Sequence, residues 1–439
     1  MAPDTVIEDS HGGNGPPKPA AMIVRLAPAF VLVLFASLGA TNAAASLLRS
    51  PLGPACHGVQ VAPGDDLQRL INTHHRRSTF CFGPGVYQLS GTVSTGSRFP
   101  RLDLRAGAVI DGQDGAFVGI NGADAPRGQR GTVILGGVFQ HFGNGSAPSW
   151  VSPVIANRNW VVVGTEFTEN FNTGLTIQGD EARVSHVNTH HNGRFGLVVT
   201  AACGDCPGPS GVLIEDSEIA FNNTRQLPIT GSAGGTKFSG GNRAMIVRHN
   251  DVHDNYGSGL WWDGYNKNAK VYGNHIHDNW GCGILYEISF GGTRIHHNTL
   301  TDNANGADAV DWMLNVQLSV ASSDGSRGGS GGIEIYANTI DGHAYPLGLV
   351  THAGRPSTKQ VQVHDNVLIL RAATSRVGAN DASGTGEMFR PSAGNRFRAN
   401  TYRVLDPDGE YWRWKGETLT WREWRALGHD SNGNVEQVV

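Results

Sequence analysis

The chain has 439 residues, of which 60 are glycine and only 16% are charged, and its formal net charge at pH 7 is −4. This composition suits a turn-rich β architecture better than a helical bundle or a disordered chain. The slightly acidic balance argues against nucleic-acid binding, which needs a clustered basic surface, and it does not favour an anionic membrane surface.

The N-terminal part contains a segment typical of a secretory signal peptide. Residues 22–45 carry a single Arg25, then an apolar run, then small residues, with cleavage expected after Ala45. The apolar run is shorter than the ~20 residues of a membrane-spanning helix, although an uncleaved anchor is the alternative. We therefore expect a secreted protein with no membrane span after cleavage. Residues 1–21 are polar and rich in proline and glycine, so we expect a non-native extension and Met22 as the true initiator.

A short helix is predicted near the start of the mature chain. Asp66 can cap its N-terminus, and the side chains of Leu67, Leu70 and Ile71 then fall on one face. Such a helix is suited to cover the first coil of a solenoid, because an open sheet edge promotes aggregation.

Five cysteines follow the signal segment. Cys56 and Cys81 flank the predicted helix, and in an exported protein we expect them to form a disulfide. Cys203 and Cys206 form a CxxC motif, but a structural zinc site needs four ligands and no second pair accompanies this one. A local disulfide is therefore the favoured interpretation, and Cys282 is expected to be buried.

The strongest signal in the chain is an internal repeat. Two sets of asparagines recur at a step of 24 residues, namely Asn250, Asn274 and Asn298, and Asn255, Asn279 and Asn303. An upstream pair, Asn170 and Asn192, is 22 residues apart, and weaker copies continue at Asn338, Asn366 and Asn400. We expect these asparagines to stack as ladders at the turns.

Short strands precede the asparagines. In residues 245–247, 269–271 and 293–295 the first and third side chains are small or apolar, a period of two that indicates strands. One strand per coil stacks into parallel sheets at a step of ~4.8 Å. The sequence thus predicts an all-β, single-stranded right-handed parallel β-helix over residues 46–405, with about 22–24 residues per coil and a helix cap at its N-terminus.

Residues 406–439 are predicted to form a C-terminal, tryptophan-rich cap. Thr420 and Glu423 form a capping-box pattern ahead of a short helix that stops at Gly428. We expect four tryptophans of this tail to pack over the last coil rather than bind sugar: Trp412, Trp414, Trp421 and Trp424.

The 24-residue register gathers three charged side chains on one outward face. Asp263 and Glu287 share a column on successive coils, about 5 Å apart, and Lys237 lies one coil earlier in the column two residues back. Two close carboxylates both stay charged only beside a cation, or else one of them holds a proton. Lys237, Asp263 and Glu287 are therefore the candidate catalytic residues. A solvated charged ladder without chemistry is the alternative.

Three kinds of chemistry fit this group. The carboxylate spacing suits a retaining glycosidase, with one acid/base and one nucleophile. The pair Asp263 and Glu287 could instead hold Ca²⁺, which prefers carboxylate oxygen. With Ca²⁺ neutralising a uronate carboxyl group, Lys237 could remove the adjacent ring proton as the base of a lyase.

Candidate substrate-binding residues lie beside this group. Outward-facing Trp261 could stack on a sugar ring or pack at the rim. Two insertions, over residues 223–235 and 304–331, are expected to build the wall of a groove. The second insertion contributes Asp311 and Trp312 as further candidates.

His253 and His277 also stack one coil apart. No third metal ligand can be placed beside them from the sequence, so we interpret them as a turn-lining pair.

Three groups of motifs resemble known proteins. The stretch from Gly64-Asp-Asp-Leu-Gln to Phe82-Gly-Pro-Gly-Val-Tyr resembles the N-terminal cap and first strand of the pectate-lyase-like superfamily. Secreted bacterial right-handed β-helix repeat proteins are similar in their repeats to Gly235-Thr-Lys237, Gly259-Leu-Trp-Trp-Asp263 and Gly283-Ile-Leu-Tyr-Glu287-Ile-Ser289, and in their tails to Trp414-x-Gly416, Trp421-x-x-Trp424 and Gly428-x-Asp430. The resemblance implies the fold. It leaves the function open, because this superfamily includes lyases, glycoside hydrolases, epimerases, tailspikes and proteins without known activity.

The function expected from these observations is an extracellular polysaccharide-active enzyme. Alginate lyases and chondroitinases of this fold place a lysine shortly after the metal-binding carboxylates, whereas the first basic residue after Glu287 is Arg294. Hydrolysis is therefore slightly favoured over a lyase reaction. The alternative is a non-catalytic glycan-binding or adhesion solenoid. A third interpretation is an accessory factor for metalloenzyme assembly, but no Met-rich or His-rich tract supports it.

Overall fold

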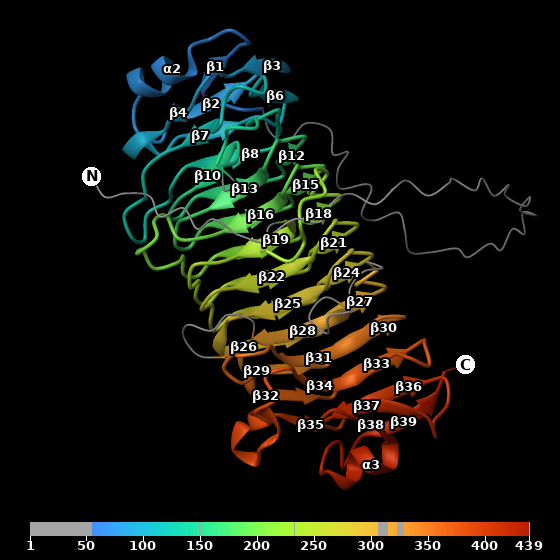
Figure 1. The fold of residues 1–439 in the computed structure, drawn as a ribbon. Helices are drawn as coiled ribbons and strands as arrows, with labels where there is room; N and C mark the ends of the chain where they lie inside the picture. The colour runs from blue at the N-terminus through green and yellow to red at the C-terminus, as the bar shows by residue number, and fades with distance from the viewer. Residues whose placement is uncertain (1–54, 149–150, 232, 306–314, 323–328, 439) are drawn as a thin grey trace, which may run out of the picture. The chain divides into compact units, whose positions relative to one another are not determined.

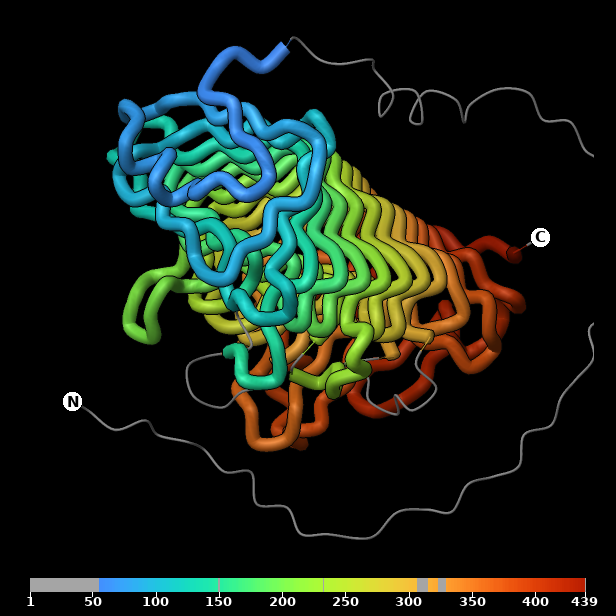
Figure 2. The backbone as a smooth tube through the Cα atoms, turned by 90° about the horizontal axis from the view of Figure 1, so that it is seen from above, coloured from blue at the N-terminus to red at the C-terminus, as the bar shows by residue number. Residues whose placement is uncertain are grey.

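The computed structural model describes residues 55–148, 151–231, 233–305, 315–322 and 329–438. The expected extension (residues 1–21), the expected signal peptide (22–45), Asp311 and Trp312 lie outside these residues. The described chain winds through three long sheets, and each coil adds one strand to each sheet (Figure 1). Viewed along the stack, successive coils overlie one another (Figure 2).

The three sheets are named A, B and C here, and their strands are given in spatial order. Sheet A consists of β1 (Val59–Val61), β2 (Thr79–Phe82), β5 (Arg101–Asp103), β8 (Val133–Leu135), β11 (Val161–Val163), β14 (Arg183–Ser185), β17 (Leu213–Glu215), β20 (Ile246–Arg248), β23 (Lys270–Tyr272), β26 (Phe290–His296), β29 (Gly331–Tyr336), β32 (Lys359–His364) and β35 (Arg396–Arg398). Sheet B consists of β3 (Gly85–Gln88), β6 (Ala108–Asp111), β9 (Val138–Gln140), β12 (Glu166–Thr168), β15 (Asn188–His190), β18 (Glu218–Ala220), β21 (Asp251–His253), β24 (His275–His277), β27 (Thr299–Thr301), β30 (Thr339–Gly342), β33 (Val367–Leu370), β36 (Thr401–Val404) and β39 (Asn434–Gln437). Sheet C consists of β4 (Val93–Ser94), β7 (Ile120–Asn121), β10 (Val154–Ala156), β13 (Thr173–Ile177), β16 (Phe195–Val199), β19 (Gly234–Phe238), β22 (Leu260–Asp263), β25 (Ile284–Glu287), β28 (Val316–Ser322), β31 (Tyr345–Thr351), β34 (Val377–Asp381), β37 (Glu410–Trp414) and β38 (Glu417–Thr420).

Five short helical segments accompany the sheets: α2 (Leu67–Thr73), α3 (Trp421–Ala426) and the 3₁₀ turns η1 (Gly96–Arg98), η2 (Glu387–Phe389) and η3 (Pro391–Ala393). The strands pair in parallel, except that β37 and β38 pair antiparallel at the C-terminal end. Among the described residues, no helix is long and apolar enough to cross a membrane. The prediction of a right-handed parallel β-helix is confirmed.

The 24-residue register is confirmed in sheet A. Val247 pairs with Val271, and Val271 pairs with Ile295, and all three side chains are fully buried. The intervening Lys270 and Arg294 are exposed. Alternation within each short strand therefore fills the interior of the coil with apolar side chains, which is the main source of its stability.

Two asparagine ladders run along the turns. In each, the side-chain amide donates to the side-chain oxygen of the next coil at 2.8–3.0 Å. One passes through Asn250, Asn274, Asn298, Asn338, Asn366 and Asn400, and the other through Asn170, Asn192, Asn222, Asn255, Asn279 and Asn303. These amides are buried, so each bond that is lost would leave an unsatisfied polar group.

The residue before a ladder asparagine turns the chain sharply from one sheet to the next. His249, Asp254, Asp278 and His297 have φ between 51° and 54°, in the left-handed region. This conformation is unfavourable for residues with a Cβ atom. The ladder hydrogen bonds that follow each of these residues help to offset its cost.

The two predicted helices are present, one near each end of the solenoid. The side chain of Asp66 accepts a hydrogen bond from the Arg69 backbone N–H at 2.9 Å, and Leu67 and Ile71 are buried in the apolar interior. That this helix closes the first coil stays a prediction. At the other end the capping box of Thr420 and Glu423 is present.

The tail packs as expected. Trp412, Trp414 and Trp424 are buried in the main core, and Trp421 packs against it. Asp430 ends the first asparagine ladder, since it accepts the amide of Asn400 at 2.9 Å.

The structure also contains both expected disulfides, Cys56–Cys81 and Cys203–Cys206. Cys282 is buried and belongs to neither of them.

Candidate functional site

The three predicted catalytic side chains come from three successive strands of sheet C. Asp263 in β22 and Glu287 in β25 are paired residues of adjacent strands, so they share one column as the sequence predicted. Lys237 lies in β19, whose Phe238 pairs with Trp262, and this register places Lys237 in the column of Trp261.

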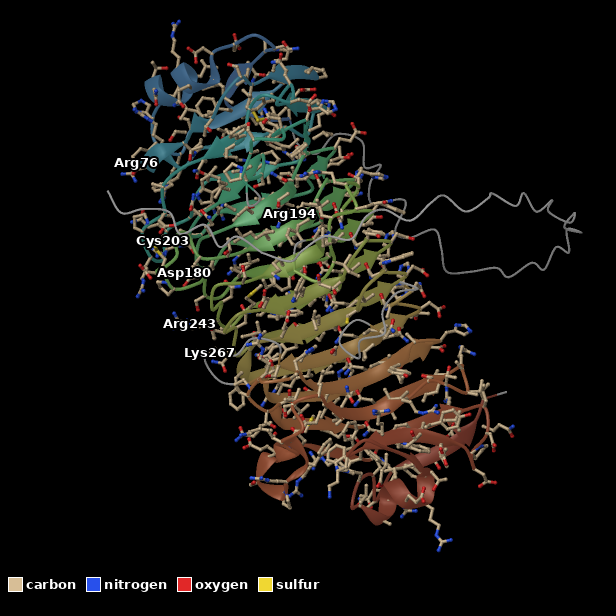
Figure 3. The ribbon with its side chains drawn as sticks, viewed as in Figure 1. Arg76, Asp180, Arg194, Cys203, Arg243 and Lys267 are labelled. Carbon is tan, nitrogen blue, oxygen red and sulfur yellow. A yellow bond between two sulfur atoms is a disulfide. The ribbon has the colours of Figure 1, made fainter. Side chains whose placement is uncertain are left out.

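Lys237 makes the central contacts of the group. Its Nζ lies 2.6 Å from Oδ2 of Asp263 and 3.2 Å from the ring centroid of Trp261, so the ammonium forms an ion pair and a cation–π contact together. Burial lowers the pKa of Lys237, while the charges of Asp263 and Glu287 act against this shift. Arg194, which precedes β16 (Figure 3), adds a weaker repulsion that lowers the same pKa.

The three side chains differ in exposure. Asp263 is 24% exposed and Lys237 12% exposed, whereas Glu287 is only 6% exposed. Solvent or a ligand therefore reaches Asp263 first. Because perturbed ionisable groups gather at functional sites more often than elsewhere, this cluster is the strongest candidate for chemistry on sheet C.

Of the two roles expected for Trp261, packing agrees with the structure and stacking on a sugar does not. The side chain projects from the outer face of sheet C, but it is only 1% exposed, and the Lys237 ammonium lies over its ring. Its indole N–H donates to Oε2 of Glu287 at 2.8 Å. Trp261 thus positions Glu287 and packs, and it presents no face to a sugar.

A second apolar cluster covers this part of the outer face. It contains Trp261, Cys282, Leu285, Val316, Ala321 and Val350. Ile229, from the first insertion, packs against it. The first insertion therefore lies over the face as expected, but the space at Trp261 is filled with side chains, and the expected open groove is not found there. Asp311 and Trp312, in the second insertion, lie outside the described residues.

The carboxylates do not form a calcium site as they stand. Ca²⁺ takes six to eight oxygen ligands, whereas Asp263 is held by the Lys237 ammonium and Glu287 accepts the indole N–H of Trp261. The residues present therefore do not fit the ion.

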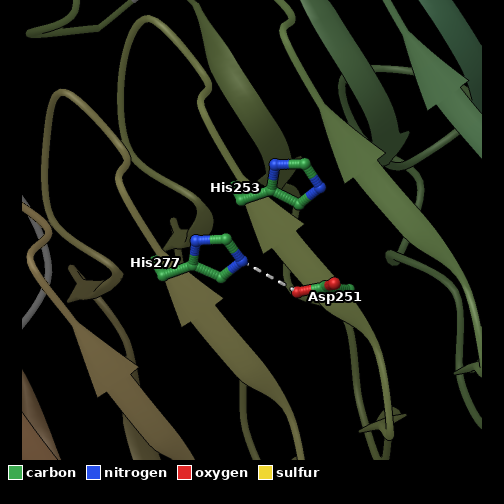
Figure 4. A group of neighbouring side chains, drawn as sticks. All are labelled: Asp251, His253 and His277. Atoms are coloured by element: carbon green, nitrogen blue, oxygen red, sulfur yellow. Dashed lines mark hydrogen bonds and ion pairs between the residues drawn. The ribbon is translucent and has the colours of Figure 1, made fainter. Parts of the chain in front are cut away.

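Sequence reasoning missed the partner of the histidine pair. His253 and His277 stack with ring centroids 4.8 Å apart and an angle of 5° between their planes. Oδ1 of Asp251 lies 3.2 Å from Nε2 of His277, so a third potential ligand is present (Figure 4). The signal was available, because Asp251 is two residues before His253 and therefore lies on the same face of its strand.

Comparisons with known proteins agree with this architecture. A family model described as "Right handed beta helix region" matches residues 154–320. No curated protein sequence shows significant similarity to the chain.

Solved structures of the same kind are similar at low identity. The catalytic unit of a GH87 α-1,3-glucanase from Streptomyces thermodiastaticus has a TM-score of 0.55 at 14% identity, and the match covers 88% of this chain and 69% of the glucanase. A mannuronic acid-specific family 6 lyase from human gut microbiota has a TM-score of 0.49 at 11% identity, over 87% and 90% of the two chains. The A-module of the mannuronan C-5 epimerase AlgE4 from Azotobacter vinelandii has a TM-score of 0.48 at 14% identity, over 73% and 85%. At such low sequence identity, the similarity to these structures indicates a shared fold only. Together with the family match over residues 154–320, the three parallel sheets show that the described chain folds as a right-handed parallel β-helix.

Proposed function

We propose that this chain is an extracellular polysaccharide-active enzyme that cleaves glycosidic bonds with Asp263 and Glu287. The observation that carries the proposal is their pairing across β22 and β25, beside a largely buried lysine. One coil step of ~4.8 Å is close to the ~5–5.5 Å that separates the two carboxyl groups of a retaining glycosidase.

The two carboxylates have different surroundings, which suits two different roles. The Lys237 ammonium neutralises Asp263, which is also the more accessible, so Asp263 is the better nucleophile. Glu287 is the more buried carboxyl group and accepts the Trp261 indole N–H, so it is held in place and takes the acid/base role. The general acid would protonate the leaving oxygen and then activate the water that releases the product.

Hydrolysis is preferred to a lyase reaction because of the position of Lys237. Burial shifts its pKa in the direction that a catalytic base requires. Its Nζ, however, is held by Asp263 and lies against the ring of Trp261, so it is not directed toward a substrate.

A non-catalytic glycan-binding solenoid is the second candidate. The observation that favours it is the low exposure of Trp261 and Glu287, because a sugar reaches Glu287 only if the covering side chains move. Export supports both candidates. The expected signal peptide over residues 22–45 fits the two disulfides, which persist in oxidising compartments.

A polysaccharide panel tests the proposal, read both by new reducing ends and by the absorbance of unsaturated uronates. We expect reducing ends without that absorbance. Once a substrate is found, Glu287→Gln and Asp263→Asn should each remove most of the activity of a folded chain, because an amide keeps the shape but cannot ionise. Asp263→Asn should also lower the melting temperature, because it breaks the ion pair with Lys237. Full activity in both variants, or glycan binding without cleavage, would leave the second candidate as the better account.

A control variant is available on another sheet. Glu334 of β29 forms an exposed ion pair with Arg294 at 3.1 Å. Glu334→Gln removes one carboxylate of a coil-to-coil ion pair without touching sheet C, so its activity should equal that of the wild type.

A further inference from the structure

A second group of ionisable side chains lies on the outer face of sheet B, away from the Lys237 group on sheet C. Asp251 and His253 belong to β21, and His277 belongs to the adjacent β24 (Figure 4). One potential ligand atom from each of the three residues lies within 4.8 Å of the other two.

The two imidazoles are oriented in the same way by the residue that follows each of them. Nδ1 of His253 lies 2.8 Å from Oδ2 of Asp254, and Nδ1 of His277 lies 2.8 Å from Oδ2 of Asp278. A histidine that donates Nδ1–H to a carboxylate has its Nε2 available for a metal, and carboxylates orient metal-binding histidines in this manner.

Both Nε2 atoms face further carboxylates. Oε1 of Glu218 lies 3.2 Å from Nε2 of His253, and Oδ1 of Asp251 lies 3.2 Å from Nε2 of His277. The parallel rings are one coil apart, so two imidazolium ions here would repel each other. One shared divalent cation satisfies the carboxylates and both ring nitrogens without this repulsion.

We propose that Asp251, His253 and His277 bind a divalent transition-metal ion of the zinc class. Glu218 is placed to supply a fourth donor. Two ligand atoms on a tetrahedral zinc ion are about 3.4 Å apart, since each bond is about 2.0–2.1 Å long. Oδ1 of Asp251 and Nε2 of His277, 3.2 Å apart, already have nearly this separation. No two of the three ligand atoms are more than 4.8 Å apart, so a shift of at most about 1.4 Å brings any pair to the separation in a zinc site.

The donor set selects the class of metal. Two imidazole nitrogens with carboxylate oxygens suit zinc and its neighbours, whereas calcium and magnesium prefer oxygen alone. The exposures of His253 (13%) and His277 (21%) leave the histidines accessible to an ion, and Asp251 is half exposed. The outer side of the site can therefore carry a water molecule as a further ligand.

A proton competes with the metal at this site. The hydrogen bond to Glu218, and after it the contact with Asp254 and the charge of Asp251, raise the pKa of His253 to about 9, although burial opposes the shift. The ionisable groups around the imidazole are Glu218, Asp251, Asp254 and His277. His275 contacts the same oxygen of Asp251 at 3.2 Å, and His190 acts on Glu218 from the adjacent coil. A metal must displace protons from the imidazole nitrogens, so affinity should increase with pH.

The test is titration of the full chain, purified without a histidine tag, with ZnCl₂ in a calorimeter and with CoCl₂ by visible absorption. We expect one ion per chain, and an affinity that weakens as the pH is lowered, because protons compete for the imidazole nitrogens. His277→Gln should raise the Kd for Zn²⁺ at least ten-fold and abolish the Co²⁺ absorption band. Asp278→Asn, which only loses the orienting carboxylate, should raise the Kd about 10–100-fold.

The matched control is His364→Gln. His364 lies in β32 of sheet A, away from the Asp251 group, and its Nδ1 contacts Oδ2 of the following Asp365 at 2.7 Å, as in His253 and His277. This variant should bind Zn²⁺ like the wild type. The proposal is overturned if the wild type binds no stoichiometric Zn²⁺, or if a folded His277→Gln chain binds Zn²⁺ as tightly as the wild type. In either case the histidines and carboxylates would form a ladder that binds protons and no metal.

Discussion

The indole N–H of Trp261 donates a 2.8 Å hydrogen bond to Oε2 of Glu287 on the next coil, outside the main core of the β-helix. Around Trp261 and Glu287, the outer face that the sequence predicts to be polar is therefore a second buried layer, in which charged and aromatic side chains contact one another. This relationship determines how the charged group can be tested without destroying the fold.

Trp261→Phe should destabilise the protein more than Trp262→Phe. Both substitutions shorten a fully buried tryptophan, but the Trp262 indole N–H has no hydrogen-bond partner, whereas that of Trp261 holds a buried carboxylate. The expected difference in the free energy of unfolding is about 1–3 kcal/mol, measured by urea denaturation. Equal losses would show that the bond to Glu287 contributes nothing.

Lys237→Met should leave Asp263 without its counter-ion and beside a second carboxylate. We expect a loss of about 2–4 kcal/mol, slightly below the range for a fully buried pair because Asp263 is partly exposed. The double variant Lys237→Met with Asp263→Asn should recover part of it, so that a double-mutant cycle gives a positive coupling energy.

The exposed Arg294–Glu334 pair is the control for this cycle, since its coupling should stay below about 1 kcal/mol. Equal coupling energies for the two pairs would argue against any special role of burial on sheet C.

Val271→Asp should be among the most damaging substitutions in the chain. Val271 is fully buried between Val247 and Ile295, so a carboxylate there has no partner and no water. The loss should be several kcal/mol, seen as a large decrease in melting temperature. Lys270→Asp, at the exposed neighbouring position, should change stability by less than about 1 kcal/mol.

In metal-free buffer, stability should decrease as the pH rises toward 9. The folded chain holds the pKa of His253 at about 9, above its ordinary value of 6.5, so folding favours the protonated imidazole. This contribution is complete below pH 6.5 and is lost as the pH rises through 9. It amounts to about 1–3 kcal/mol after allowance for the half-exposed carboxylates Glu218 and Asp254.

His253→Gln should make the free energy of unfolding, measured by chemical denaturation, less dependent on pH between 6.5 and 9. His296 provides a contrast, because burial and neighbouring positive charges lower its pKa. His296→Gln should therefore leave the decrease in place.

Much of the fold could be predicted because a solenoid is built from local repeats. The spacing of Asn250, Asn274 and Asn298 gives the coil length, and alternation around Val271 gives the inward side chains. Both are properties of neighbouring coils, which contact each other through nearly the same residues at every step. The column of Asp263 and Glu287 follows from the same arithmetic.

The sequence alone determined the coil length, the stacking of the asparagines, the inward columns and the carboxylate pair, because each depends only on register between adjacent coils. Only the tertiary structure decided what covers the outer face. The burial of Trp261 depends on Ile229 from an insertion and on Val316 and Val350 from later coils. The metal-ligand geometry of Asp251 with His277 depends on side-chain rotamers across two strands. A repeat pattern specifies on which face of the sheet a side chain lies. It does not specify what packs over that side chain, because loops and rotamers do not follow the repeat.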